Sequence, residues 1–194
     1  VFIVCEGNFM YGNASLSYYS PLEKKVENTV FIRANGIPLG DVAQSLTIYD
    51  KTAWIIVNNS GKVYAIDIDN FKIKGKITDL VSPRYMRFIN PQKAYITDLY
   101  AKNIYVVNPQ DYSLTKTINI DDGSGKYYNH SSEQIVVFEN KLFINTWSYD
   151  NKILVIDTNS DEVIDSIEVF KQPRKIVADK EKNLWVLSDG GSDY

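Results

Sequence analysis

The sequence has few of the residues from which most metal and catalytic sites are built. Its 194 residues include one histidine, His130, and one cysteine, Cys5. A metal site with several histidine ligands and an internal disulfide are therefore both excluded within this chain. Cys5 lies in an apolar run, so we expect it to be a small buried side chain and not a nucleophile. No serine stands in a Gly-x-Ser-x-Gly turn, which is the turn that presents the nucleophile in many hydrolases.

One polar segment, 121–126, superficially looks like a calcium-binding or phosphate-binding loop. Its residues have neither the EF-hand spacing nor the P-loop spacing. We therefore predict a turn at this segment. We also predict no metal site, no cofactor and no catalytic residue in this chain.

Positive charge and long apolar runs are also scarce. The formal net charge is −3 and the chain contains no basic run, which argues against a nucleic-acid-binding surface. The longest apolar runs have the length of strands, so no transmembrane segment is predicted. No stretch shows a helical period that is sustained over a normal helix length. These absences favour an all-β chain.

What the sequence has instead is a repeat of short strands. An aromatic side chain recurs in the second strand of each unit, at intervals of 52, 41, 48 and 42 residues. A period in the forties, built from short strands, is typical of a β-propeller, in which each repeat forms one four-stranded antiparallel blade. The recurring aromatic residues are Phe2, Trp54, Tyr95, Phe143 and Trp185. We expect the two tryptophans, Trp54 and Trp185, to fill the cores between blades.

The other strands of each repeat can be recognised from composition. Runs of β-branched and aromatic residues that close on Tyr, Asp or Asn predict third strands followed by turns. Fourth strands alternate charged or polar residues with Ile or Leu, as expected of an outer edge. Third strands are predicted at 15–19, 63–67, 104–108 and 153–157, and fourth strands at 72–77, 114–118 and 163–167. The innermost, first strands are predicted at 45–48, 85–88, 134–137 and 175–178.

These strands make three complete blades and two partial ones. The complete blades span about 43–77, 83–120 and 132–169, and the partial blades span about 1–31 and 173–194. Propellers close with at least four blades, and the common ones have six to eight. We therefore expect residues 1–194 to form a single propeller domain, or a fragment of one, with about four to five blades.

Several segments resemble a known family. Residues 95–98 followed by 104–108, and 143–146 followed by 153–158, are similar to the YVTN-type propeller repeat. The segments Glu-Gly-Asn at 6–8 and Leu-Gly-Asp-Val-Ala-Gln-Ser at 39–45 are more specific. Together with 15–19 and 82–85 they resemble the surface-layer-like, YncE-type propeller lipoproteins of gut Bacteroidota. The resemblance covers essentially the whole chain.

The resemblance carries implications that the composition alone does not. Members of that family are typically seven-bladed, exported and lipid-anchored, and some capture cobalamin at the cell surface and pass it to an outer-membrane transporter. The resemblance therefore implies part of a seven-bladed propeller outside the cytoplasm, at the outer-membrane surface, with a lipid anchor outside this segment. It also implies a small-molecule ligand, with cobalamin as the candidate, or an outer-membrane transporter or surface protein as partner.

The topology of a propeller predicts which loops share a face. Loops that enter first strands and loops that join second to third strands lie at the same end of the blades, and loops on a rigid scaffold often carry function. The entering loops are about 33–44, 78–84, 121–133 and 170–174. The second-to-third loops are 6–14, 58–62, 98–102 and 146–152.

Four polar residues fall at equivalent positions, where first strands begin. They are Gln44, Arg84, Glu133 and Arg174, spaced 40, 49 and 41 residues apart. One interpretation is a ring of hydrogen-bonding groups that faces a ligand at the mouth of the central channel. The other is that the arginines pair with Glu133 or with nearby carboxylates and join adjacent blades.

Aromatic residues are common in the loops of this face. Tyr100, Trp147 and Tyr149 follow second strands and have polar neighbours, which suits a large planar ligand, a sugar or a peptide. The entering loop 121–133 adds Tyr127 and Tyr128. The alternative is that these aromatic residues only pack loops between blades. We include Tyr100, Trp147 and Tyr149 with the polar ring as candidate ligand-binding residues.

Three functions from different classes remain open. The one that we favour is a non-enzymatic cell-surface protein that captures a small-molecule nutrient on its loop face. The second is a surface-layer scaffold for protein–protein interactions. The third, a propeller enzyme of the quinoprotein or lactonase type, would need clustered metal ligands or tryptophans that stack on a cofactor, and this segment shows neither pattern. The fold alone decides none of the three.

Overall fold

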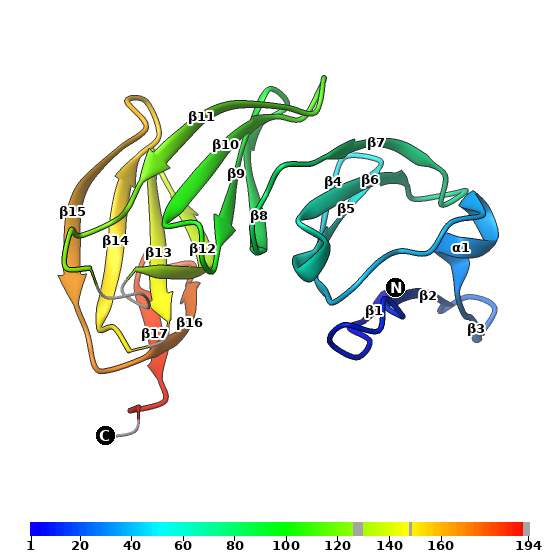
Figure 1. Ribbon diagram of the computed structural model, residues 1–194, viewed down its shortest axis with the longest axis horizontal. Coiled ribbons are helices and arrows are strands. Elements are labelled where there is room, and N and C mark those ends of the chain that lie inside the picture. The colour runs from blue at the N-terminus through cyan, green and yellow to red at the C-terminus, as the bar shows by residue number, and fades with distance from the viewer. Residues whose placement is uncertain (126–129, 148, 192–194) are drawn as a thin grey trace. The chain divides into compact units, whose positions relative to one another are not determined.

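The computed structural model describes residues 1–125, 130–147 and 149–191. It divides into two compact units, Val1–Pro83 and Arg84–Tyr194, and each is described by itself. The described residues form antiparallel sheets with one short α-helix (Figure 1). The prediction of an all-β protein built from four-stranded antiparallel blades of the propeller type is confirmed.

The first unit contains one three-stranded sheet and one four-stranded sheet. The three-stranded sheet consists of β1 (Phe2–Cys5), β2 (Ser15–Ser20) and β3 (Lys25–Glu27), in that order. The helix α1 (Val30–Asn35) follows it. The four-stranded sheet consists of β4 (Ala43–Tyr49), β5 (Thr52–Val57), β6 (Lys62–Asp67) and β7 (Ile73–Ile77), with the single 3-10 turn η1 (Asn58–Ser60) after β5.

The second unit contains two four-stranded sheets and a two-stranded one. In each sheet, strands that are consecutive in the sequence are neighbours, which is the meander of a propeller blade. The first sheet comprises β8 (Pro83–Asn90), which begins at the last residue of the first unit, β9 (Lys93–Asp98), β10 (Asn103–Asn108) and β11 (Ser113–Asn119). The others comprise β12 (Ser131–Phe138), β13 (Lys141–Trp147), β14 (Lys152–Asp157) and β15 (Glu162–Glu168), and then β16 (Pro173–Ala178) with β17 (Leu184–Ser188).

Burial within each sheet follows the strand composition. Every residue of β5 is buried, and β6, β10 and β14 are buried along their central four residues. The fourth strand β15 is exposed along its whole length. Strands in the middle of a sheet bury both faces and can be apolar throughout, whereas charged residues on an edge discourage pairing with other chains.

Each third strand ends in a turn that a side-chain oxygen stabilises. Asp67 Oδ1 accepts hydrogen bonds from the backbone N–H groups of Asp69 (3.0 Å) and Asn70 (3.1 Å). Asp157 Oδ1 accepts the equivalent bonds from the residues two and three positions later. These bonds favour the ionised carboxylate and lower the pKa of both Asp67 and Asp157. The Asp or Asn that closes these strands in the sequence is therefore a turn residue.

The recurring aromatic residues are not equally buried. Tyr95 is fully buried and donates its hydroxyl to Asp161, which also pairs with Lys93. Trp54 is 4% exposed. Trp185, by contrast, is 63% exposed, and its indole N–H donates to Asp179 Oδ2 (2.8 Å). The prediction of a buried core position is wrong for Trp185, because in the two-stranded sheet β16–β17 no strand of the described residues covers that side chain.

The prediction for Cys5 is also wrong. The thiol is free and exposed, because side chains of β1 alternate between half-buried and exposed and Cys5 falls on the exposed face. A run of apolar letters cannot by itself distinguish a strand with two buried faces from a strand with one.

Candidate functional site

The strand registers bring the two predicted sets of loops to one end of each sheet. Ser131 at the start of β12 lies opposite Trp147 at the end of β13, and Pro173 at the start of β16 lies opposite Ser188. In the first unit Ala43 lies opposite Val57 in the same way. Within each sheet, the entering loop and the second-to-third loop therefore share an end, which we call the loop face.

Three of the four residues of the predicted polar ring lie at β-bulges. The pairing of first and second strands shifts register between Ala43 and Ser45, between Ser132 and Ile135, and between Pro173 and Lys175. A bulge inserts an unpaired residue into a strand and re-aims its side chain. The residues at these shifts include Gln44, Glu133 and Arg174. Gln44 belongs to the first unit and the other two belong to the second.

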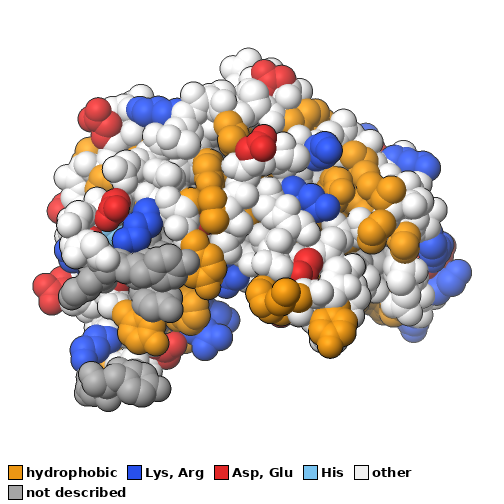
Figure 2. All heavy atoms as spheres, viewed as in Figure 1, with side chains coloured by type: hydrophobic (Ala, Val, Ile, Leu, Met, Phe, Trp, Pro, Cys, Tyr) orange, Lys and Arg blue, Asp and Glu red, His pale blue; other side chains and the backbone are white. Residues whose placement is uncertain are grey.

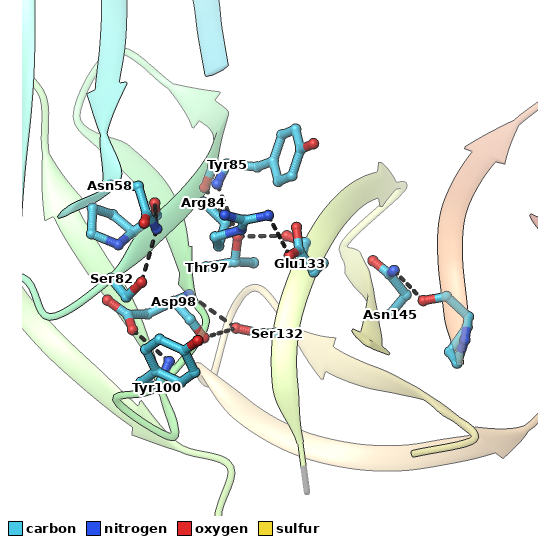
Figure 3. A network of polar contacts seen from close by, with 12 residues as sticks. Asn58, Ser82, Arg84, Tyr85, Thr97, Asp98, Tyr100, Ser132, Glu133 and Asn145 are labelled. Atoms are coloured by element: carbon cyan, nitrogen blue, oxygen red, sulfur yellow. Dashed lines mark hydrogen bonds and ion pairs between the residues drawn. The ribbon is translucent and has the colours of Figure 1, made fainter. Parts of the chain in front are cut away.

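Arg84 and Glu133 form an ion pair on the loop face of the second unit. Arg84 Nη2 lies 2.6 Å from Glu133 Oε1, and both side chains are largely buried. Figure 3 shows the guanidinium group of Arg84 pointing toward the carboxylate of Glu133, with Thr97 beside them. Burial raises the pKa of Glu133, and the charges of Arg84 and Arg174 partly offset this rise. The pair joins β8 to β12, as the interpretation in terms of blade-joining ion pairs expects.

Arg174 is placed differently from Arg84. It lies at the start of β16, is exposed, and attracts Glu133 electrostatically. Among the residues that the structure describes, Arg174 forms no ion pair. Its guanidinium group is therefore accessible on the loop face, and the ligand-facing interpretation suits Arg174 better than it suits Arg84.

Polar side chains at the ends of second strands hold the neighbouring first strands. Thr97 Oγ1 donates to the carbonyl oxygen of Glu133 (2.5 Å), and Asn145 Nδ2 donates to the carbonyl oxygen of Pro173 (2.5 Å). Figure 3 shows both side chains directed toward the neighbouring backbone. In the first unit, Asn58 Nδ2 makes the equivalent bonds to Ser82 Oγ and to the carbonyl oxygen of Pro83. The repeated contact fixes where each first strand begins.

Two buried polar atoms near the end of β13 have no partner in the part of the chain that the structure describes. The Asn145 Oδ1 atom and the Trp147 indole N–H group are buried and make no hydrogen bond within the described residues. Buried polar atoms are normally paired, and an unpaired one calls for an explanation. Both atoms lie near the loop-face end of β13, but neither is exposed to solvent.

A cavity of about 230 Å³ lies where the second-to-third loop 146–152 meets the entering loop 170–174. The backbone N–H of Gln172 donates to the carbonyl oxygen of Asp150 (2.7 Å), and that of Val169 donates to Asn151 (2.8 Å). The loops that line the cavity are thus joined by backbone bonds. Its lining residues are Tyr149, Asp150, Asn151, Lys171, Gln172 and Gly191; we call it the loop-face pocket.

Asp150 is the most firmly held residue of the loop-face pocket. Its Oδ2 atom accepts a hydrogen bond from the backbone N–H of His130 (2.9 Å), and the His130 Nε2 atom lies 3.6 Å from the same oxygen. The Nδ1 atom of His130 lies 2.5 Å from the carbonyl oxygen of Ile120. The single histidine of the chain is therefore buried behind the pocket and supports its wall.

Only part of the predicted group of aromatic ligand-binding residues lies at the loop-face pocket. Tyr149 lines the loop-face pocket and is 58% exposed. Trp147 is half-buried at the end of β13. Tyr100 is 44% exposed and its backbone N–H donates to Asp98 Oδ1, but it does not line the pocket. The predicted loop residues Tyr127 and Tyr128 lie outside the described residues.

Sequence reasoning did not single out Asn151, Lys171 and Gln172 as pocket residues. Their loops, 146–152 and 170–174, were both predicted to lie on the loop face. The missing information was which entering loop meets which second-to-third loop, and the backbone bonds between 150–151 and 169–172 supply it. In the described residues, no three His, Cys, Asp or Glu side chains are placed to hold a metal ion.

The loop face of the first unit is organised around Asp41. Its Oδ2 atom accepts hydrogen bonds from the backbone N–H of Met10 (2.9 Å) and from Asn59 Nδ2 (2.6 Å). Its backbone N–H donates to Ser60 Oγ (3.0 Å). Asp41 therefore joins three loops, and the segment 39–45, which carries part of the family resemblance, has a structural role.

Gly40, next to Asp41, allows this close arrangement. Its φ is +132°, and a Cβ atom at this position would lie 2.7 Å from Ser60 Oγ and 2.9 Å from Val57 Cγ1. The carbonyl oxygen of Gly40 accepts the backbone N–H of Ala14 (3.1 Å). A cavity of about 200 Å³ beside these loops is lined mainly by apolar residues, including Leu16, Phe31 and Leu39.

The loop 6–14 presents three large side chains to solvent. Phe9, Met10 and Tyr11 are 65%, 77% and 76% exposed. Figure 2 shows hydrophobic side chains projecting over the loop that follows β1. Asp41 holds the backbone at Met10, whose φ is +68°. The exposed residues therefore stand on an anchored loop, which we call the apolar tip.

Comparison with known protein families decides the family of this sequence. Residues 1–191 match DUF5074, which is described as a domain of unknown function. The chain belongs to the DUF5074 family. No curated protein matches its sequence. The finer resemblance to YncE-type surface lipoproteins stays a prediction.

Solved structures similar to this DUF5074 chain are β-propellers at low sequence identity. The β-propeller domain of Myceliophteria thermophila Cps50 (Swd1) has a TM-score of 0.73 at 11% identity, over 91% of this chain and 56% of that one. Virginiamycin B lyase from Staphylococcus aureus has a TM-score of 0.68 at 20% identity, over 93% and 58%. Hydrazine synthase from Kuenenia stuttgartiensis has a TM-score of 0.65 at 19% identity, over 74% and 40%.

These likenesses extend to the fold alone. The DUF5074 chain spans between two fifths and three fifths of the length of the solved structures that it matches. No helix among the described residues is long and apolar enough to cross a membrane.

Proposed function

We propose that this DUF5074 chain is part of a non-enzymatic binding protein that captures a small molecule on its loop face. The observation that carries the proposal is the loop-face pocket of about 230 Å³, where two loop segments meet around Tyr149 and Asp150. Ligand pockets combine apolar or aromatic surface with a few fixed polar groups. Tyr149 supplies the aromatic surface, and Asn151 and Gln172 supply polar groups.

A further group on the same end of the second unit supports the proposal. The guanidinium group of Arg174 is exposed, one residue after Pro173, where β16 begins. An accessible cation favours a ligand that carries hydrogen-bond acceptors.

The family resemblance supplies cobalamin as the candidate ligand. A corrinoid is larger than a cavity of about 230 Å³, so the loop-face pocket would receive only one edge of the molecule. The corrin ring carries amide side arms, and an amide group matches the mixture of donors and acceptors on Asn151 and Gln172. Tyr149 would then lie against the apolar part of the ring.

The same resemblance supports the place and the partners of the protein. We propose that it acts at the outer-membrane surface, held by a lipid anchor outside this segment. An outer-membrane transporter or surface protein would receive the captured molecule. No membrane contact of the propeller itself is part of the proposal.

Titration of the intact protein with cobalamin tests this function. Calorimetry gives the stoichiometry, and the visible absorbance of the corrinoid reports binding independently. We expect saturable one-to-one binding. If no heat and no absorbance change occur at high micromolar cobalamin, the corrinoid proposal is wrong and a protein-interaction scaffold becomes the better account.

The apolar tip favours that second function. Phe9, Met10 and Tyr11 expose large side chains on a loop that Asp41 anchors, and exposed aromatic residues and methionine are common at protein interfaces. A surface-layer or transporter partner would bind this tip. If the scaffold account is right, replacing Phe9 and Tyr11 by serine abolishes co-purification with that partner, whereas Tyr149→Ala leaves it intact. The reverse pattern would contradict it.

A further inference from the structure

A second cavity in the second unit lies along the innermost strands and away from the loop-face pocket. Its volume is about 370 Å³, within the roughly 300–1,000 Å³ typical of pockets for small organic ligands. It lies toward the other end of the first strands, because Ala178 is the last residue of β16, whereas Arg174 near its start belongs to the loop face. The lining residues are Arg87, Val136, Val137, Ile176, Val177 and Ala178; we call it the inner-strand cavity.

The walls of the inner-strand cavity are apolar and fixed by packing. Val136 and Ile176 are 7% and 3% exposed and belong to one hydrophobic cluster with Ile153. Leu184 and Val186 of β17 pack against the same cluster. Val177, at 57% exposure, forms an accessible part of the lining. A hydrocarbon group would bury apolar surface here without rearranging the strands.

Among the described residues that line this cavity, Arg87 is the one that carries a charge. Its Nη2 atom lies 3.4 Å from the carbonyl oxygen of Ile135, which is beyond the usual length of such a bond. Arg87 makes no other hydrogen bond or ion pair within the described ranges 1–125, 130–147 and 149–191. A guanidinium group has five N–H donors, so most of those of Arg87 remain available.

The combination of an apolar wall and one accessible guanidinium group defines a ligand class. We infer that the inner-strand cavity binds a small carboxylate with a hydrocarbon tail. The carboxylate accepts two parallel hydrogen bonds from Arg87, which is the pairing that a planar guanidinium group favours. The tail lies against Val136, Ile176 and Val177. A neutral alcohol of the same length lacks the charge, and acetate lacks the tail, so each ligand loses one of the two contributions.

The test measures octanoate binding to the intact protein by calorimetry, below the micelle concentration, beside octanol and acetate. We expect saturable octanoate binding and at least tenfold weaker binding of octanol and of acetate. Arg87→Gln keeps a polar side chain of similar reach and removes the charge, and we expect it to weaken octanoate binding at least tenfold. Lys180→Gln, which removes an exposed charge from the turn between β16 and β17, is the matched control and leaves binding unchanged.

A second variant keeps the test decisive if Arg87→Gln disturbs the fold. Val177→Trp places a large side chain in the cavity from an exposed position and is expected to abolish octanoate binding while Arg87 stays in place. Octanoate that binds Arg87→Gln as tightly as the wild type, or octanol that binds as tightly as octanoate, would overturn the inference, as would the absence of octanoate binding. Tyr149→Ala changes cobalamin binding only, so failure here is distinguishable from failure of the loop-face proposal.

Discussion

The two units build the same kind of loop face in different ways. In Val1–Pro83 a side chain joins the loops, because Asp41 bonds to Met10, Asn59 and Ser60. In Arg84–Tyr194 the loops around the pocket are joined mainly by backbone bonds, such as those between Gln172 and Asp150. Side chains that hold loops together are unavailable to a ligand. Loops held by their backbones leave Tyr149 and Arg174 exposed.

Because of this difference, the segments that carry the family resemblance and the pocket proposed to bind ligand lie in different units. The segments 6–8 and 39–45, which carry the more specific resemblance, lie in the first unit, where 39–45 contributes to the closed arrangement around Asp41. The pocket proposed to bind ligand lies in the second unit and is built from residues outside those segments. The predictions below test this division, beginning with the largest expected effect.

The two second-strand tryptophans should differ most in how much they contribute to the unfolding free energy. Trp54→Ala removes a side chain that is 4% exposed and should cost about 3–5 kcal/mol of unfolding free energy. Trp185→Ala removes one that is 63% exposed and should cost less than about 1 kcal/mol. Chemical denaturation of both variants of the intact protein measures the two values. Equal costs would show that the second-strand aromatic is equally buried at both positions.

Gly40→Ala should destabilise the first unit through its backbone. A positive φ is energetically unfavourable for a residue that has a Cβ atom, and the new Cβ atom would also contact Val57 and Ser60. We therefore expect a loss of about 2–4 kcal/mol of unfolding free energy. Gly36→Ala is the matched control, because Gly36 also has a positive φ but has open space at its Cβ position. It should cost about 1 kcal/mol. Denaturant midpoints check both values, and similar losses would refute the close packing around Asp41.

Replacing Arg84 should affect mainly stability, whereas replacing Arg174 should affect mainly ligand binding. Arg84→Ala leaves Glu133 buried without its 2.6 Å partner and should cost about 2–3 kcal/mol of stability. Arg174→Ala should leave the melting temperature unchanged and weaken cobalamin binding about tenfold, since it removes an exposed cation. Thermal melts and calorimetry on both variants check this. A stable Arg84→Ala that loses affinity would move Arg84 from the structural to the ligand-binding group.

The titration of Glu133 should produce the smallest effect. Its pKa in the folded protein is raised above the unfolded value of 4.5, mainly by burial. The folded protein therefore retains a proton that the unfolded chain has lost, and the unfolding free energy falls as the pH rises from about 4.5 through the folded pKa. Glu133→Gln should lack this slope. The urea midpoints of the wild type and of Glu133→Gln, measured across this pH range, test the difference in slope. Parallel curves of midpoint against pH would contradict the raised pKa of Glu133.

Much of the fold could be predicted from the sequence, because blade strands have distinct compositions. The predicted first strands at 45–48 and 134–137 fall inside β4 and β12, and the Asp that closes a third strand is a turn residue, as at Asp67 and Asp157. The burial of side chains in the first and last sheets along the chain could not be predicted. Cys5 and Trp185 sit in apolar runs, but each lies in a sheet of fewer than four strands.

The candidate site was only partly predictable. Periodicity placed Glu133 and Arg174 at equivalent positions, and the β-bulges explain why polar residues occur there. Periodicity could not tell the buried pair of Arg84 and Glu133 from the exposed Arg174, because that depends on side-chain contacts between strands. It also could not show that Lys171 and Gln172 meet Tyr149, since non-local loop packing has no sequence period.

Cobalamin titration of three proteins tests the central claim most directly: the wild type, Tyr149→Ala in the loop-face pocket, and Tyr11→Ala in the apolar tip. Both tyrosines are exposed, so neither change should alter the fold. The account predicts one-to-one binding by the wild type, the same affinity for Tyr11→Ala, and about tenfold weaker binding by Tyr149→Ala. Weaker binding by Tyr11→Ala with Tyr149→Ala unchanged, or no binding by the wild type, would contradict it.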